Sequence, residues 1–153
     1  MPLANDYKIY GRLFPLEYLI NKVDFNSTDH QTAWLPPDDS EFIESVLLDL
    51  PLGDFWVWSN NTHTYLVDGF ERLRTVKSFL ACEFGLEYLD ILENLNGLYA
   101  SGIGSYYQRK FGESHVVVTI VQTDNEAIAH STITRCTGRH KWEEKNQWKL
   151  FNL

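Results

Sequence analysis

The chain has 153 residues, of which 44% are hydrophobic and 22% charged, and 21 acidic against 13 basic residues give a net charge of −8. This length and composition predict a single globular domain, residues 1–153, and argue against a long disordered tail. The negative charge disfavours DNA as a partner, because nonspecific affinity for DNA comes from Lys and Arg side chains that neutralise phosphates. A protein partner with a basic surface is compatible with it.

The cysteines and the N-terminal sequence predict a cytoplasmic protein. Cys82 and Cys136 are far apart and show no CxxC spacing, so we expect reduced thiols rather than a disulfide framework. The first residues lack the basic and apolar regions of a signal peptide. No segment approaches the roughly 20 apolar residues of a membrane span, so we expect no membrane contact.

Residues 1–38 form the least regular part of the chain. Asp38, Asp39 and Ser40 are candidate N-caps for a helix over 41–50, whose apolar residues share one stripe. Two β-prone runs follow at 55–58 and 64–67, with a turn between them.

The remaining pattern predicts helices at 69–81, 86–95 and 125–135. Between them lie a Gly- and Ser-rich loop at 96–105 and a strand at 115–121, whose β-branched run is typical of a strand buried on both faces. We expect Asp124 to cap the last helix and Thr137-Gly138 to end it. Strands interleaved with helices predict an α/β (α+β) fold; a small mixed sheet with flanking helices is what the family resemblance described below implies. The C-terminal aromatic residues favour a tail docked on its own core over a partner site.

The segment 65–75 has the outline of an anion site, because a β-prone run ends at residue 67 and a helix begins almost at once. Free amides at a helix N-terminus attract anions, and Gly69 allows close approach of a ligand. Arg72 and Arg74 are candidate phosphate ligands. Asp68 and Glu71 are candidates to hold a divalent cation or to position a water.

A structural interpretation of the same residues is equally open. Asp68 and Glu71 have the spacing of a capping box, in which each side chain accepts a hydrogen bond from the other's backbone N–H. Asp68 and Arg72 would then form an i,i+4 pair worth only about 0.3–0.5 kcal/mol.

Segment 41–80 resembles a known family in both order and spacing. The matching pieces are Phe42–Leu48 with its Ile-Glu-Ser core, the Leu-Pro turn at 50–51, the strand 55–58, and Val67-Asp68-Gly69-Phe70-Glu71-Arg72-Leu73. They are similar to the N-terminal domain of GmrSD-type modification-dependent restriction enzymes, catalogued as domain of unknown function 262. Weaker similarity continues to residue 138.

The resemblance implies a ParB/sulfiredoxin-like fold that binds and hydrolyses a nucleoside triphosphate with Mg²⁺, in many members as part of DNA restriction. By position it retains Asp68, Gly69 and Arg72. Together with the chemistry of the turn, it leads us to expect Asp68, Glu71 and Arg72 in catalysis, and Gly69, Arg72, Arg74 and Arg135 at the phosphates. Asp68 and Glu71 would bind the metal.

The motif departs from the family pattern, which has Asp-Gly-Gln-Gln-Arg at the turn. Phe70 and Glu71 replace both glutamines, an early arginine position holds Thr32, and Thr134 and Cys136 replace a later arginine and asparagine. Arg135 is the neighbouring substitute for that arginine.

The sequence is therefore compatible with two alternative functions. The first is a nucleotide-binding domain with hydrolytic or DNA-nicking activity. The second is a non-catalytic acidic interaction protein, such as an inhibitor or decoy of a host restriction system or of another DNA-handling protein.

Overall fold

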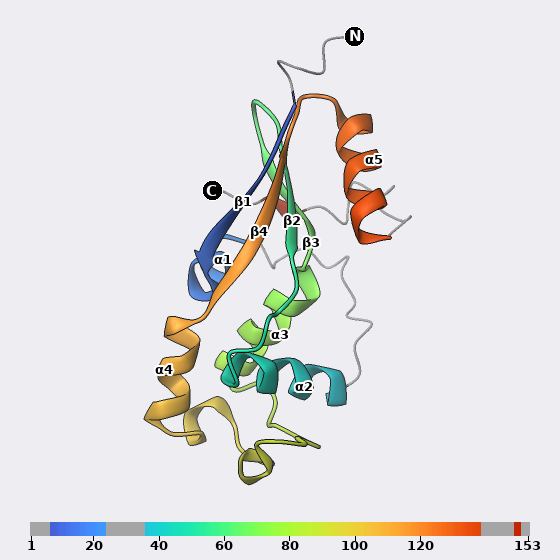
Figure 1. Cartoon of the computed structure of the whole chain (residues 1–153). Coiled ribbons are helices and arrows are strands. Elements are labelled where there is room, and N and C mark those ends of the chain that lie inside the picture. Colours follow the sequence, from blue (N-terminus) through green and yellow to red (C-terminus); the bar gives the residue numbers. More distant parts are fainter. Residues whose placement is uncertain (1–6, 24–35, 139–148, 151–153) are drawn as a thin grey trace.

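The computed structural model describes residues 7–23, 36–138 and 149–150. The chain forms a sheet with helices packed around it, and a second group of helices and loops lies beyond one end of the sheet (Figure 1). In chain order the elements are β1 (Lys8–Pro15), α1 (Leu16–Lys22), α2 (Pro36–Leu47), β2 (Phe55–Ser59), β3 (Thr64–Asp68), α3 (Phe70–Leu80), η1 (Glu93–Leu95), η2 (Ala100–Gly102), α4 (Ser105–Glu113), β4 (His115–Gln122), α5 (Glu126–Thr137) and β5 (Lys149–Leu150).

The sheet is mixed and has the strand order β1-β4-β2-β3-β5. Strand β4 pairs antiparallel with β1 and parallel with β2. The β2–β3 hairpin is antiparallel, and the two-residue β5 pairs antiparallel with β3. The α/β (α+β) prediction is therefore confirmed.

Two hydrophobic cores lie on opposite faces of this sheet. Val57 and Trp58 are neighbours on β2, and side chains of neighbouring strand residues point to opposite faces. Val57 belongs to the main core, with α1, α2 and α3. Trp58 belongs to a smaller core under α5, with Val121, Ala129 and Ile133. Helices α3 and α5 therefore pack on different faces.

The N-terminal segment is more regular than its sequence indicated. Strand β1 pairs with β4 along its whole length, from Lys8 opposite Gln122 to Pro15 opposite His115. Its side chains are mostly exposed, with Phe14 the buried exception. The usual apolar alternation is therefore weak, because β1 is an edge strand whose side chains contribute little to either core.

The helix predicted over 86–95 is wrong. Leu86, Leu89 and Leu95 are buried, but the backbone there is a loop that ends in the short helix η1. Its N–H groups find acceptors outside a helix: Leu86 donates to Leu98 O at 2.9 Å, and Leu89 donates to Asn96 Oδ1 at 2.8 Å. Burial of leucines at helical spacing is thus achieved without a helix. Helix α4, which follows at Ser105–Glu113, was not predicted.

The β4–α5 region corrects two details and confirms a third. Val117 on β4 is 42% exposed, so the strand is not buried on both faces throughout. The N-cap of α5 is Asn125, which accepts hydrogen bonds from the N–H groups of Ala127 and Ile128. Asp124 instead accepts from Asn61. The helix does end at Gly138, which has φ 71° and donates to Thr134 O.

Both cysteines, Cys82 and Cys136, are free and exposed. No helix among residues 7–23, 36–138 and 149–150 is both long and apolar enough to cross a membrane. The prediction that the aromatic tail docks on its own core concerns Trp142, Trp148 and Phe151, which lie outside the described residues.

Candidate functional site

The turn from strand to helix occurs near the position predicted from the sequence, at residues 68–70. Asp68 ends β3, Gly69 is the N-cap of α3 with φ 114°, and the helix begins at Phe70. Gly69 has no side chain with which to cap this helix end, and the turn depends on the conformational freedom of glycine. The capping box between Asp68 and Glu71 stays a prediction.

Gly69 has a packing role in this turn. A Cβ atom built on Gly69 would lie 2.2 Å from Cδ2 of Phe55, and Phe55 is fully buried. The Phe55 ring therefore fills the space on the Cβ side of Gly69, and a phosphate cannot approach the glycine from that direction.

Arg72 holds the segment that leads into β2. Its Nη1 donates to the carbonyl oxygen of Leu52 at 2.6 Å, and its Nη2 donates to that of Asp54 at 2.8 Å. The guanidinium carbon lies 4.2 Å from the centre of the Phe55 ring, within cation–π range. Asp68 Oδ2 is 3.8 Å from Nη2. These contacts make Arg72 a clamp between α3 and the segment 52–55.

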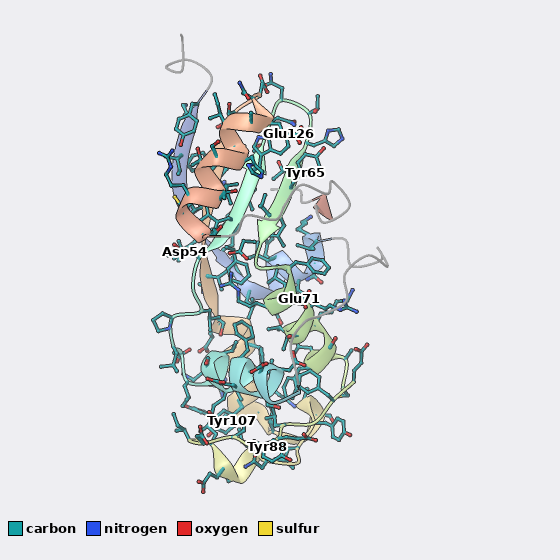
Figure 2. All side chains as sticks on the ribbon, turned by 90° about the vertical axis from the view of Figure 1, so that its right-hand side faces the viewer. Asp54, Tyr65, Glu71, Tyr88, Tyr107 and Glu126 are labelled. Atoms are coloured by element: carbon teal, nitrogen blue, oxygen red, sulfur yellow. The ribbon has the colours of Figure 1, made fainter. Side chains whose placement is uncertain are left out.

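Glu71, in the first turn of α3, contributes a carboxylate to the same region. Its Oε2 is buried and has no hydrogen-bond partner among the described residues. Buried polar atoms are nearly always paired with protein or water. This oxygen is thus the feature of the turn most compatible with a further ligand. Figure 2 places Glu71 at mid-height in the molecule.

Arg74 lines a different feature, a cavity of about 160 Å³ that also involves Asp39, Thr75, Ser78, Glu83 and Phe84. Thr75 Oγ1 donates to Asp39 Oδ1 at 2.7 Å. Burial raises the pKa of the Asp39 carboxyl above its usual value, the Thr75 hydrogen bond opposes this change, and the neighbouring Asp38 adds to it.

Arg135 does not join the turn. It lies in the last turn of α5, on the face of the sheet opposite to α3. The groove that it lines, between α5 and β1, includes Tyr7 and Ile9 but no residue of segment 68–74. Among the described residues no group of three or more His, Cys, Asp or Glu side chains is placed to hold a metal ion.

The loop between α3 and α4, residues 81–104, is a second candidate surface, which we call the acidic loop. No Lys or Arg occurs between Lys77 and Arg109. All four acidic residues of the loop are exposed: Glu83, Glu87, Asp90 and Glu93. The loop therefore carries negative charge without any cation of its own.

Large apolar side chains are exposed on the same loop. Tyr88 is 78% exposed, Ile91 64% and Tyr99 49%. Figure 2 shows Tyr88 at one end of the molecule and Glu126 at the other. The acidic loop thus presents aromatic and aliphatic groups among carboxylates at the end of the molecule away from α5.

Buried contacts hold the acidic loop in place. The buried Glu44 of α2 accepts hydrogen bonds at Oε2 from Ile91 N at 3.0 Å and Leu92 N at 2.8 Å. Ser40 Oγ accepts one from Glu87 N at 3.0 Å. These bonds fix the backbone beneath the exposed side chains.

The sequence contains one signal for this surface, which lies outside the motif at 65–75. A run of 31 residues, 78–108, has no cation in a chain with 13 of them, and charge patterning of this kind marks solvated or partner-binding segments. The anchoring role of Glu44 had no such signal, because its partners are backbone amides nearly fifty residues away.

Comparisons of the chain with protein-family models, with curated proteins and with solved structures found no match. The GmrSD-type and ParB/sulfiredoxin-like assignments therefore stay predictions.

Proposed function

We propose that the protein acts as a non-catalytic binding protein whose acidic loop docks on a basic surface of another protein. The observation that carries the proposal is the exposure of Tyr88 and Ile91 on a firmly anchored, cation-free loop. Tyrosine side chains are enriched among the residues that dominate binding energy.

Charge and rigidity support the same function. Carboxylates around an apolar patch steer a basic partner toward it and disfavour acidic partners. Anchoring by Glu44 and Ser40 lowers the entropy lost on binding, because the loop is already ordered. The proposal matches the inhibitor or decoy function expected from the degenerate motif, and the two exposed thiols fit a cytoplasmic location.

Affinity capture followed by titration tests this function. The immobilised chain is exposed to a lysate of its native cells, and each recovered protein is titrated calorimetrically into wild type, into Tyr88→Ala/Ile91→Ser and into a control, Leu50→Ser. Leu50 is 46% exposed but lies outside the loop.

We expect at least one basic protein that binds wild type and the Leu50→Ser control alike and binds the double variant at least tenfold more weakly. Equal binding to the double variant, or recovery of no protein that binds in solution, would contradict the proposal.

Nucleotide binding with Mg²⁺ is the second candidate function, and the unpaired Oε2 of Glu71 favours it. A carboxylate oxygen is a suitable ligand for Mg²⁺, whereas Asp68 is already beside Arg72. Titration of Mg²⁺-ATP into wild type and Glu71→Gln separates the two functions. Saturable heat that Glu71→Gln abolishes supports the nucleotide function, and its absence in wild type rejects it for ATP.

A further inference from the structure

Strand β1 presents an unusual edge. It is eight residues long, and within the described part of the chain it pairs only with β4. Ile9 is 46% exposed and Leu13 68% exposed. A long edge strand with exposed apolar side chains is a template for pairing with another strand. Figure 2 shows β1 at the left edge of the sheet, with α5 in front of the sheet.

We infer that β1 pairs antiparallel with β1 of a second copy of this chain, about a twofold axis through Gly11 that is perpendicular to the sheet. Such an axis keeps the α5 faces of both sheets on one side. In an antiparallel pair, directly opposite residues point to the same face, whereas neighbouring residues of one strand point to opposite faces. An axis between two residues would place side chains of different faces opposite each other, so the axis passes through a residue.

The register centred on Gly11 places complementary side chains opposite each other. On the α5 face, Ile9 of each copy meets Leu13 of the other. Leu13 already neighbours Val117, which is 42% exposed. Leu13 of the second copy also reaches the rim of the groove of about 620 Å³ that Ile9 lines together with Ile128 and Thr132. Apolar surface is therefore covered on both copies.

The opposite face agrees with the same register. Arg12 meets Tyr10, which is 38% exposed, so this cation faces an accessible aromatic ring. Lys8 lies opposite the buried Phe14 and meets no like charge. Moving the axis to residue 10 would place Lys8 opposite Arg12, and moving it to residue 12 would place Arg12 opposite Arg12. Like charges directly opposite each other destabilise a strand pair, so Gly11 is the favoured centre.

The pairing leaves the acidic loops accessible. The loop lies beyond the end of the sheet away from α5 (Figure 1), and a twofold axis through the middle of β1 sends the two loops to opposite ends of the pair. The dimer would therefore present two docking surfaces. This inference does not depend on the proposed function, because it concerns another strand and another face.

Sedimentation equilibrium provides the first test. Wild type is expected at twice the chain mass of 17.8 kDa, and Leu13→Lys at the single mass with an unchanged circular dichroism spectrum. The control Ile91→Lys, whose side chain is also exposed at 64%, should stay dimeric. A monomeric wild type at about 50 µM, or a dimer that Leu13→Lys leaves intact, would overturn the inference.

Cross-linking tests the register independently of Leu13. In a Cys82→Ser/Cys136→Ser background, Gly11→Cys should form an interchain disulfide on mild oxidation, and Lys8→Cys should not. Gly11 tolerates the change, since a Cβ there meets only Val117 Cγ1 at 3.9 Å. Cross-linking through residue 8 as readily as through residue 11 would contradict the proposed register.

Discussion

At the residue scale, the arginine that sequence patterns assign to phosphate chemistry has its guanidinium bonded to the protein's own backbone. Arg72 donates to two carbonyl oxygens and stacks on Phe55. A guanidinium suits both tasks, because it offers several fixed donors and a flat face. Whether such a side chain binds a phosphate or the backbone depends on whether carbonyl oxygens lie close to it in the folded chain. The local sequence pattern does not reveal this.

Replacing Arg72 should therefore weaken the fold. Arg72→Ala leaves two carbonyl oxygens without their donor and exposes the ring of Phe55, so we expect a loss of about 2–4 kcal/mol in the free energy of unfolding. Urea denaturation measures it, with Arg109→Ala on the exposed side of α4 as the control, expected within about 0.5 kcal/mol of wild type. An Arg72→Ala variant as stable as the control would refute the clamp.

The packing role of Gly69 predicts a contrast between two glycines. Gly69 and Gly97 both have positive φ, at +114° and +86°, but only Gly69 would bring a Cβ against another residue. Alanine at either site strains the backbone, and at Gly69 it also collides with Phe55. We expect Gly69→Ala to cost about 1–3 kcal/mol more than Gly97→Ala in urea denaturation. Equal losses would mean that Phe55 moves aside freely.

Asp39 predicts a dependence of stability on pH. Burial raises its pKa in the folded chain above the ordinary value of 3.8, so the folded state binds this proton more tightly than the unfolded state does. The contribution of Asp39 to stability therefore falls as pH rises from near 3.8 through the folded pKa. Asp39→Asn keeps an acceptor for Thr75 and should be more stable than wild type at pH 7.

Denaturation of the Asp39→Asn variant and wild type between pH 3.5 and 7 measures this effect. The advantage of the variant should shrink toward low pH, where both side chains are neutral. Asp90→Asn, at an exposed position, serves as the matched control. An advantage that is constant with pH would contradict the assignment to Asp39.

At the element scale, the sequence predicted the elements that have a strong local pattern. The helices α2, α3 and α5 and the strands β2, β3 and β4 all occur near their expected positions. Two of the failures share one cause. Strand β1 and the acidic loop obtain their conformations from distant partners, namely β4 and Glu44. Hydrophobic periodicity reflects only residues that are close along the chain. The leucine spacing in the loop therefore predicted a helix over 86–95 that does not form.

Glu44 should control the order of the acidic loop. Glu44→Ala removes the acceptor for two backbone amides, and we expect it to cost about 2–3 kcal/mol and to speed amide exchange over 86–99 selectively. Glu44→Gln keeps an oxygen acceptor and should lose less. Hydrogen exchange followed by mass spectrometry reports both effects. Unchanged exchange of the loop in Glu44→Ala would show that other contacts suffice to hold it.

At the scale of the whole molecule, three surfaces are separate from one another. The turn at 68–74 is largely committed to internal contacts, the β1 edge suits a second copy of the chain, and the acidic loop lies at one end of the molecule (Figure 2). The fold class could be predicted from the sequence, and so could the turn. The lack of cations in the acidic loop is also visible in the sequence. Which of its apolar side chains remain exposed is not, because that depends on the path of a non-helical loop.

Hydrogen exchange of the chain alone and bound to its captured partner distinguishes these surfaces in one measurement. We expect the partner to slow amide exchange in peptides covering 83–99 and to leave exchange in 68–74 and β1 unchanged. Slower exchange confined to 68–74 or to 8–15, with no change over 83–99, would contradict the assignment of function to the acidic loop.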